Sequence, residues 1–544
     1  MTPDLRGFEL DGDIGAPDPV SAVLDGLGQA FGIATEPGAP GSGARQHTWL
    51  DTFDWRLYRA GLVLEYEHTR RGGRLLLSKD EVPLAEQPAE RWRGPRLAED
   101  LPAGPVRDQI LKLASPRALL PMATAAGAVT VTRLLNADGK TVARLIVDRA
   151  AVTRADQAVP LPPRLAITEV RGYLSQARRA AHILADAPGV APARQSAFLA
   201  ALHALGRHPN DYSGGVSADI TAQMPASVAV ATLLLGLLDT LERNVDGTLR
   251  DIDTEFLHDL RVSVRRTRSA IKLLGGVLPD GLAGAYAAEF KWLGDLTTPT
   301  RDLDVHLLGF GPMTEHLVAA SAADLEPFRA YLVRRRAREF RRLAAGLRSA
   351  RFKAVTDHWR KALVEVRDAG RPRKRRREPT AAELAVSTTG RAFRRIVAKG
   401  RAITQDSPPE SLHDLRKRSK ELRYLLEFFA PLYDPVLYKK VVGNLKQLQD
   451  CLGEFQDSQV QREEIHALAG AMLAERAAPA ATLLAMGEIA ANLAISQAEA
   501  REDFSSRFAK FAGPAGQERI RALLAGPSEP DETPLASAPD GAEA

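Results

Sequence analysis

The chain has 544 residues, 45% of them hydrophobic, and a formal net charge of +5. This length favours at least two domains, and the composition is that of a soluble globular protein. The single cysteine, Cys451, excludes an intramolecular disulfide and fits a reducing cytoplasm. The first residues lack a basic segment followed by an apolar stretch, so we expect no signal peptide. The longest apolar run, Val228–Leu238, is too short to cross a bilayer, so we expect no membrane contact.

The first 187 residues combine short runs of Leu, Val and Ile with frequent glycine and proline, a pattern typical of strands joined by turns. Four of these runs are Gly61–Glu67, Arg74–Ser78, Val129–Leu135 and Thr141–Asp148. The last two are separated by Asn136-Ala-Asp-Gly139, in which glycine adopts the positive φ of a turn at little cost. We therefore predict a mostly antiparallel α+β domain over residues 1–187.

The remainder of the chain changes character after a segment rich in proline and glycine. Residues 188–219 are interpreted as a linker that contains a short helix. From residue 220 to about 515, apolar residues recur at helical spacing, so we predict an all-helical domain. The basic segment Gly370–Pro379 divides this domain into two parts, about 226–350 and 380–515.

These two parts are predicted to be copies of one unit. The pentapeptide Leu257–Arg261 (LHDLR) recurs letter for letter as Leu412–Arg416, an offset of 155 residues. With the same offset and no gap, basic and acidic residues also match in pairs: Arg265 with Lys420, Arg268 with Arg423, Lys291 with Lys446 and Asp302 with Asp457. Because the matches continue without a gap to Val305 and Val460, we infer an internal duplication and predict a pseudo-twofold axis.

Each copy carries a stripe of basic residues along one predicted helix. At about 100° per residue, the five stripe residues of the first copy fit within roughly 80° of arc along about 20 Å of helix. They are His258, Arg261, Arg265, Arg268 and Lys272. In the second copy they are His413, Arg416, Lys420 and Arg423. Apolar residues lie beside each stripe, so the cations follow the edge of the buried face.

Stripes of this kind favour an anionic ligand, because cations at i,i+3 and i,i+4 spacing repel one another. Arginine offers a planar fork that suits phosphate oxygens, and lysine offers a compact charge. The alternative is that acids of the protein itself neutralise the stripes, and the candidates are Asp259, Asp302, Asp414 and Asp457. The recurrence of the stripe at matching positions of both copies leads us to favour anion binding.

Two further basic clusters lie outside the stripes. Six arginines crowd one predicted helix from Arg334 to Arg342, and the segment Arg371–Arg377 is almost entirely positive. Either cluster alone is typical of a solvated face or a flexible loop, but together they favour steering of a polyanion toward the helical domain. The tail, 525–544, contains acids but no Lys or Arg, and we expect it to be disordered.

The paired LHDLR motifs, each followed by a basic residue four positions and an arginine seven positions after the motif's arginine, resemble the CHAD domain. The resemblance covers about residues 220–515 and implies two antiparallel four-helix bundles related by pseudo-symmetry. It also implies binding of inorganic polyphosphate and, in bacteria, association with polyphosphate granules. The binding residues that it implies are His258, Arg261, Arg265, Arg268, Lys291, His413, Arg416, Lys420, Arg423 and Lys446. Lys272 is added from the stripe, although Glu427 takes its place in the second copy.

The N-terminal region resembles the CYTH, or triphosphate tunnel, domain through the segments Trp49–Asp54 and Leu57–Leu62. This resemblance implies an antiparallel β-tunnel, and it places Lys79, Arg133 and Asp148 at strand positions of the family. The catalytic pattern of the family is degenerate in this chain. Three segments differ from it: Glu9-Leu-Asp11-Gly-Asp13 lacks the expected lysine, Glu65-Tyr-Glu67 stands where Arg-x-Arg is expected, and Glu169-Val-Arg171 stands where Glu-x-Glu is expected.

The missing cations bear on catalysis, because a triphosphate is held by cations and its divalent metal by carboxylates. We therefore expect little or no triphosphatase or cyclase activity, and we assign no catalytic residue and no cofactor. Mg²⁺ or Mn²⁺ is implied only if the CYTH-like domain retains activity, and the weak candidates for its ligands are Glu9, Asp11 and Glu169.

Three functions remain open from the sequence. The favoured one is polyphosphate binding by the helical domain, without catalysis, at polyphosphate granules in the cytoplasm. The second is a metal-dependent triphosphatase in the N-terminal tunnel, which the pairing of the two domains supports. The third is nucleic-acid binding, which the Arg371–Arg377 segment suggests, while the low aromatic content of 6% counts against it.

Overall fold

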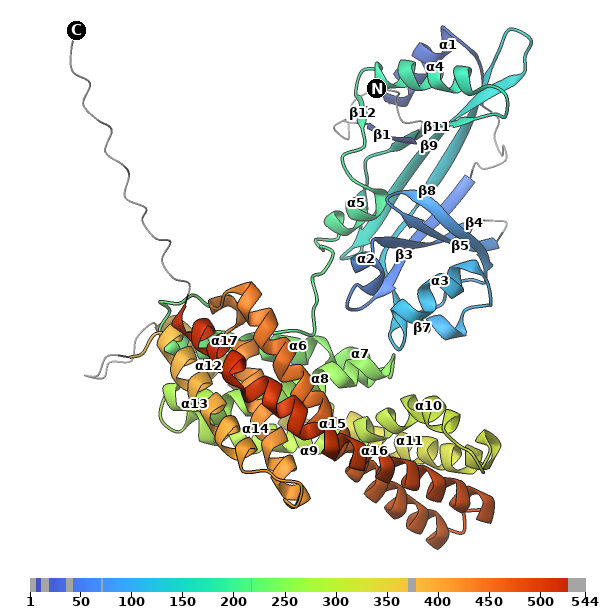
Figure 1. Ribbon diagram of the computed structural model, residues 1–544. Coiled ribbons are helices and arrows are strands. Elements are labelled where there is room, and N and C mark those ends of the chain that lie inside the picture. Colours follow the sequence, from blue (N-terminus) through green and yellow to red (C-terminus); the bar gives the residue numbers. More distant parts are fainter. Residues whose placement is uncertain are drawn as a thin grey trace, which may run out of the picture. The chain divides into compact units, whose positions relative to one another are not determined.

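The computed structural model describes residues 6–10, 19–35, 43–69, 72–216, 218–369 and 378–526. The chain divides into two compact units, Met1–Gly214 and Gly215–Ala544. Figure 1 shows a strand-rich first unit and an all-helical second unit, which confirms the predicted multidomain class. None of the described helices has both the length and the apolar character that a membrane crossing requires.

The N-terminal unit is built on one antiparallel sheet. Its strands are β1 (Arg6–Leu10), β2 (Gly32–Thr35), β3 (Gly43–Thr52), β4 (Leu62–Thr69), β5 (Gly72–Lys79), β6 (Val82–Ala89), β7 (Arg96–Leu97), β8 (Ala118–Leu135), β9 (Thr141–Arg154), β10 (Gln157–Pro160), β11 (Arg164–Glu169) and β12 (Val190–Pro192). Their spatial order is β12-β1-β11-β9-β8-β3-β4-β5-β6, with β2 and β7 paired to β8 and β10 paired to β9. The helices are α1 (Pro19–Gly28), α2 (Arg56–Arg59), η1 (Ala98–Asp100), α3 (Pro105–Ala114), α4 (Leu174–Ala185) and α5 (Ala197–Ala204).

The four apolar runs of the sequence correspond to β4, β5, β8 and β9, so the predicted antiparallel sheet is confirmed and is consistent with a CYTH-like tunnel. The turn between β8 and β9 closes as expected, because Asn136 N–H donates to the carbonyl oxygen of Lys140 at 3.0 Å and Gly139 has a φ of 72°. Alternation along the strands buries Leu145 and Leu165 on the face that α1 and α4 cover.

The segment 188–219, predicted as a linker, largely belongs to the N-terminal unit, which extends to Gly214. Strand β12 pairs with β1, and Phe198 and Leu202 of α5 are buried in a cluster with Trp49 and Trp55. A three-residue strand is too short to show alternation, so the sequence pattern could not reveal that β12 adds an edge to the sheet.

The second unit contains only helices in its described part. They are α6 (Ala226–Arg243), α7 (Val245–Leu249), α8 (Thr254–Leu274), η2 (Gly275–Val277), α9 (Leu282–Leu308), α10 (Phe310–Glu315), η3 (Ala322–Leu325), α11 (Glu326–Leu347), α12 (Ala350–Ala369), α13 (Ala381–Arg401), α14 (Pro409–Phe428), η4 (Ala430–Leu432), α15 (Pro435–Ala474), α16 (Ala480–Ala512) and α17 (Pro514–Ala525). Helix α17 continues past the predicted boundary at 515, because Ile520 and Leu523 are buried in the core.

The duplication is visible in the helix boundaries and in contacts between equivalent residues. Helices α6 and α13 begin at 226 and 381, and helices α8 and α14 begin at 254 and 409, each pair 155 residues apart. Ala226 N–H donates to Pro379 O at 3.0 Å, and the equivalent Ala381 N–H donates to Met224 O at 2.8 Å. Reciprocal bonds of this kind form only where a twofold axis passes between equivalent residues, so the predicted pseudo-twofold is confirmed.

One continuous apolar core joins the two copies, and it includes Leu260 of α8, Leu415 of α14 and Leu445 of α15. A second cluster combines Phe328 of α11 with Ile465 of α15 and Ile489 of α16. The two repeats therefore share their buried surface, and the helices that carry the basic stripes are held in fixed register by it.

Two ion pairs join α8 to α14, and the axis relates one to the other with the charges exchanged. Arg266 Nη2 lies 3.0 Å from Glu427 Oε2, and Lys272 Nζ lies 2.7 Å from Glu421 Oε1. Glu421 is the counterpart of Arg266, and Glu427 is the counterpart of Lys272. The first copy is thus basic and the second acidic at this contact, which favours pairing of unlike repeats.

Replacing Glu427 by lysine is expected to destabilise the helical unit by about 2–3 kcal/mol, because it sets a cation against the mostly buried Arg266 guanidinium. Thermal unfolding followed by circular dichroism at 222 nm would measure the change. The exchanged variant R266E/E427K restores opposite charges and is expected to recover about half of the loss. Equal stability of E427K and the unmodified chain would mean that the Arg266–Glu427 ion pair does not stabilise the contact between α8 and α14.

Candidate functional site: a basic groove on the pseudo-twofold axis

The basic stripes of the two copies line one groove. Two adjoining cavities of about 390 Å³ each share Arg265, Arg416, Lys420 and Asp457, and we name their union the central groove. Its arginine and lysine residues are Arg261, Arg265, Arg266, Arg301, Arg416, Lys420 and Arg423, and His258 also lines it. The predicted residues brought together here are His258, Arg261, Arg265, Arg416, Lys420 and Arg423.

The helix starts position these stripes. The Asp253 carboxylate accepts hydrogen bonds from the N–H groups of Glu255 at 2.9 Å and Phe256 at 3.2 Å, which fixes the first turn of α8 just before His258. Pro409 occupies the first position of α14, where a missing N–H costs nothing. Buried residues such as Leu260 and Leu415 then turn the adjacent cations toward the groove.

The centre of the groove lies on the pseudo-twofold axis, because its two middle cations, Arg265 and Lys420, are equivalent residues of the two copies. Within the described ranges, neither side chain forms an ion pair with a carboxylate of the protein. The Arg265 guanidinium lies 5.9 Å from the centre of the Tyr424 ring, a cation–π contact. Within those ranges the groove therefore has two central cations without an ion pair to a carboxylate, although the charge of Asp457 acts on Lys420.

Burial and neighbouring cations lower the pKa of three groups that line the groove. Burial, together with the charges of Arg416 and Arg265, lowers the pKa of Lys420 to about 8. Burial and the nearby Arg301 lower the pKa of His258, and burial lowers the pKa of Arg261 although Asp302 opposes the shift. The charged forms of these groups are therefore disfavoured in the free protein, and a bound polyanion would favour them.

Acids of the protein neutralise the flanks of the groove. Arg416 lies 2.9 Å from Asp457, Arg423 lies 2.7 Å from Glu427, and Arg261 lies 3.8 Å from Asp302. The alternative of internal neutralisation thus holds for the flanking arginines in part, whereas Asp414 pairs with Lys399 on another side of α14. Internal neutralisation does not account for Arg265 and Lys420, which form no ion pair within the described ranges.

Replacing Asp457 by asparagine is expected to raise the affinity for a polyanion about 3- to 10-fold, because it frees Arg416 and removes a negative charge from the groove. Titration with a fluorescently labelled long-chain polyphosphate would measure the change. A weaker affinity than that of the unmodified chain would mean that Asp457 mainly holds Arg416 in its binding position.

The other predicted residues lie outside the lining of the central groove. Lys272 pairs with Glu421 across the repeat contact, and exposed Lys291 pairs with Asp295 at 2.6 Å. His413 Nδ1 lies 2.5 Å from Gln456 Oε1, Arg268 lies across Gly294 of α9, and Lys446 is exposed.

Two arginines of the groove were not predicted from the sequence. Arg301 of α9 contacts Glu255 at 3.5 Å, and its counterpart in the second copy is Gln456. Arg266 of α8 has an acid, Glu421, as its counterpart. The predicted residues were those that are basic in both copies or that lie on the stripe of the first copy, and neither Arg301 nor Arg266 meets either condition.

Part of the arginine cluster on α11 has a structural role. Arg336 donates to Asp251 through both terminal nitrogens at 2.7 Å and through Nε to the buried Asp304 at 2.5 Å. This arginine therefore ties α11 to α9 and to the turn before α8. The basic segment Arg371–Arg377 and residues 527–544 of the tail lie outside the described residues.

Two acids of the CYTH-like pattern, Glu65 and Glu67, form ion pairs within the N-terminal unit. Buried Glu67 pairs with Arg45 at 2.6 Å and with Arg74. His47 lies between Glu65 and Asp148, and although burial opposes it, hydrogen bonds to these two carboxylates raise the pKa of His47 to about 10. This sheet face therefore carries internal ion pairs where the family pattern has phosphate-binding cations.

The weak metal candidates are not brought together. Glu9 of β1 is opposite Arg164 of β11, and alternation along β11 puts Glu169 on the other face of the sheet. Asp11 lies outside the described residues. In the described part of the chain, no three His, Cys, Asp or Glu side chains are grouped as a metal would require.

The geometry defines a duplicated all-helical module with a basic groove on its symmetry axis. Residues 232–466 match the model of the CHAD domain, and this part of the chain is a CHAD domain. The crystal structure of the CHAD domain from the plant Ricinus communis is similar, with 23% identity, a TM-score of 0.41, and coverage of 57% of this chain and 96% of that chain. PptA from Streptomyces chartreusis is similar with 16% identity, a TM-score of 0.40, and coverage of 52% and 99%. No curated protein matches the chain.

Proposed function

We propose that this protein binds inorganic polyphosphate in the central groove and thereby associates with polyphosphate granules inside the cell. The observation that carries the proposal is the pair of cations, Arg265 and Lys420, at the centre of the groove without a carboxylate partner in the described ranges. The CHAD domain is linked to polyphosphate binding, which supports the same reading.

A linear polyphosphate suits a groove with a twofold axis, because the chain reads the same from either end. The cations follow one another from His258 and Arg261 through the central pair to Arg416, so successive phosphates would meet donors from both copies. Arginine forks and the Lys420 ammonium supply hydrogen bonds to ionised oxygens, which are stronger than neutral ones. Binding of this kind needs no catalysis, and we propose no activity for the N-terminal unit.

Competition between polyanions tests the proposal. The full chain, saturated with labelled long-chain polyphosphate at moderate salt, is expected to keep it when double-stranded DNA is added at equal phosphate concentration. Displacement by DNA would instead indicate a nucleic-acid-binding protein. Competition is needed because the binding of either polyanion depends on salt, so salt dependence alone does not distinguish the two ligands. In cells that make polyphosphate, a fluorescent fusion that stays diffuse beside visible granules would contradict granule association.

Phosphate release tests the remaining alternative, a triphosphatase in the N-terminal unit. We expect no release from tripolyphosphate with Mg²⁺ or Mn²⁺, because Glu65 and Glu67 are held by His47, Arg45 and Arg74. If phosphate were released, and Glu9→Ala abolished the release, the N-terminal unit would be a triphosphatase. The helical unit would then have only a tethering role.

A further inference from the structure

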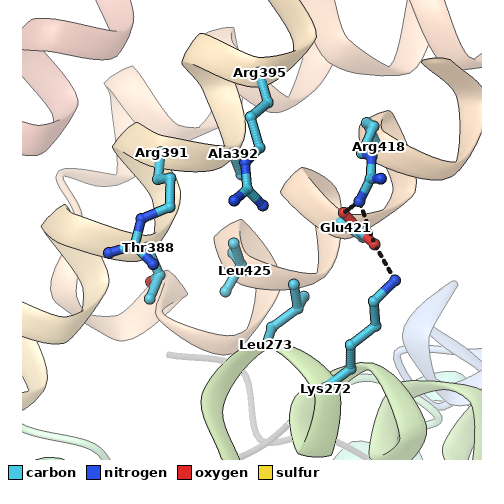
Figure 2. Close-up of a pocket in the computed structure, with 9 residues that line it drawn as sticks. All are labelled: Lys272, Leu273, Thr388, Arg391, Ala392, Arg395, Arg418, Glu421 and Leu425. Carbon is cyan, nitrogen blue, oxygen red and sulfur yellow. Dashed lines mark hydrogen bonds and ion pairs between the residues drawn. The ribbon is translucent and has the colours of Figure 1, made fainter. Parts of the chain in front are cut away.

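A second basic pocket lies apart from the central groove, between α13 and α14 beside the end of α8. It has a volume of about 140 Å³, and we name it the α13–α14 pocket. Its charged lining residues are Lys272, Arg391, Arg395, Arg418 and Glu421. Figure 2 shows Arg395, Arg418 and Lys272 approaching the pocket from three different helices, with Leu273 and Leu425 between them.

Positive charge exceeds negative charge in this pocket. Glu421 is the single acid of the lining, and it already accepts from Lys272 Nζ at 2.7 Å and from Arg418 Nη1 at 3.1 Å. In the part of the chain that the structure describes, exposed Arg391 and Arg395 have no hydrogen bond or ion pair. The buried Nε of Arg418 likewise has no hydrogen-bond partner there, and its nearest carboxylate oxygen outside Glu421 is that of Asp414 at 3.8 Å.

The arginines of the α13–α14 pocket have no basic counterparts in the first copy. The counterparts of Arg391, Arg395 and Arg418 in the first copy are Gly236, Thr240 and Ser263. Ser263 is 1% exposed and donates to the Leu237 carbonyl oxygen, so this position of the first copy is part of a closed helix contact. The three arginines are therefore a feature of the second copy alone, distinct from the matched stripes.

We propose that the α13–α14 pocket binds a compact phosphate anion of one or two phosphorus atoms, held by Arg391, Arg395 and Arg418. Arginines one helical turn apart on α13 present their forks to the same side, and Arg418 faces them from α14. The volume admits a small anion or the terminal group of a chain, whereas the interior of a long chain has no room. The inference does not depend on polyphosphate binding in the central groove.

Calorimetric titration with pyrophosphate tests the proposal. The titrated protein is the full chain with R265E/K420E, which replaces the two central cations of the central groove by acids. Adding R391Q/R395Q is expected to weaken pyrophosphate binding at least about 10-fold. The matched control R394Q/R401Q removes the same charge from exposed positions of α13 outside the pocket and is expected to change the affinity less than about twofold.

Two results would overturn the proposal: unchanged pyrophosphate affinity in R391Q/R395Q, or an equal loss in R394Q/R401Q. Tripolyphosphate in the same background separates the two sources of the anion. A tighter affinity for tripolyphosphate than for pyrophosphate assigns the pocket to chain ends, and equal affinities assign it to the free anion. Failure of long-chain binding to the unmodified chain would affect the central groove alone, so the two proposals fail separately.

Discussion

Replacing Arg265 and Lys420 together by glutamate is expected to weaken the binding of long-chain polyphosphate to the full chain at least about 100-fold. Hydrogen bonds to charged groups contribute about 1.5–3 kcal/mol each, and the variant removes two such donors and adds repulsion. Because fewer cations release counter-ions, the salt dependence of binding is also expected to become shallower. Fluorescence anisotropy at several salt concentrations would measure both effects.

The control for this prediction is R338E/R341E, which changes the net charge by the same amount at exposed positions of α11 outside the groove. We expect it to change the affinity only a few-fold, through the long-range field. Similar losses in the two double variants would mean that the protein attracts polyphosphate by its overall charge distribution, and that the central groove has no special part in binding.

Polyphosphate affinity is expected to fall about 10- to 100-fold between pH 8 and pH 10. The pKa of Lys420 is about 8 in the free protein, and a bound polyanion would raise it toward the ordinary value of 10.5. Below pH 8 the ammonium is charged in both states, so this group adds no pH dependence there. Above pH 8 the free protein loses the proton that the complex keeps, so binding must take up a proton.

Calorimetry in buffers of different ionisation enthalpy would count the protons taken up at pH 8.5. The variant K420R supplies the control, because arginine stays charged throughout this range. It is expected to bind polyphosphate with little pH dependence between 8 and 10 and without proton uptake. The same steep loss in K420R would assign the pH dependence to another group.

The charged Lys420 side chain lowers the stability of the folded protein when no ligand is bound. Because folding lowers the pKa of Lys420, the charged lysine destabilises the folded state at pH values below about 8, and this penalty decreases as the pH rises from 8 toward 10.5. Lys420→Met is therefore expected to raise the stability of the free protein by about 1 kcal/mol while it weakens polyphosphate binding. A substitution that stabilises the free protein and weakens ligand binding is typical of a residue that serves binding.

The sequence predicted the main features of the helical unit because the signals are local or repeated. Helical spacing located the helices, and the 155-residue offset located the stripes that meet in the groove. The same calculation placed Lys272 in the stripe, yet the structure pairs it with Glu421. The end of α8 passes α14 at that point, and the position of a neighbouring helix is information that one helix's periodicity does not contain.

Contacts between distant segments explain the other differences. Arg301 reaches the groove from α9 and has no basic counterpart, so a search for duplicated cations missed it. In the N-terminal unit, the sequence places two acids, Glu65 and Glu67, on one predicted strand. Their partners, His47 and Arg45, depend on the register of β3 against β4, which strand alternation alone does not fix.

Labelling of lysines by an amine-reactive reagent, read by mass spectrometry, tests the central claim most directly. At pH 8 about half of the Lys420 side chains are neutral amines in the free protein, so Lys420 is expected to react faster than the exposed Lys439 and Lys440. Saturating long-chain polyphosphate is expected to protect Lys420 at least about 10-fold and to leave Lys439 and Lys440 unchanged. Lys420 that reacts equally fast while polyphosphate is bound would contradict binding in the central groove.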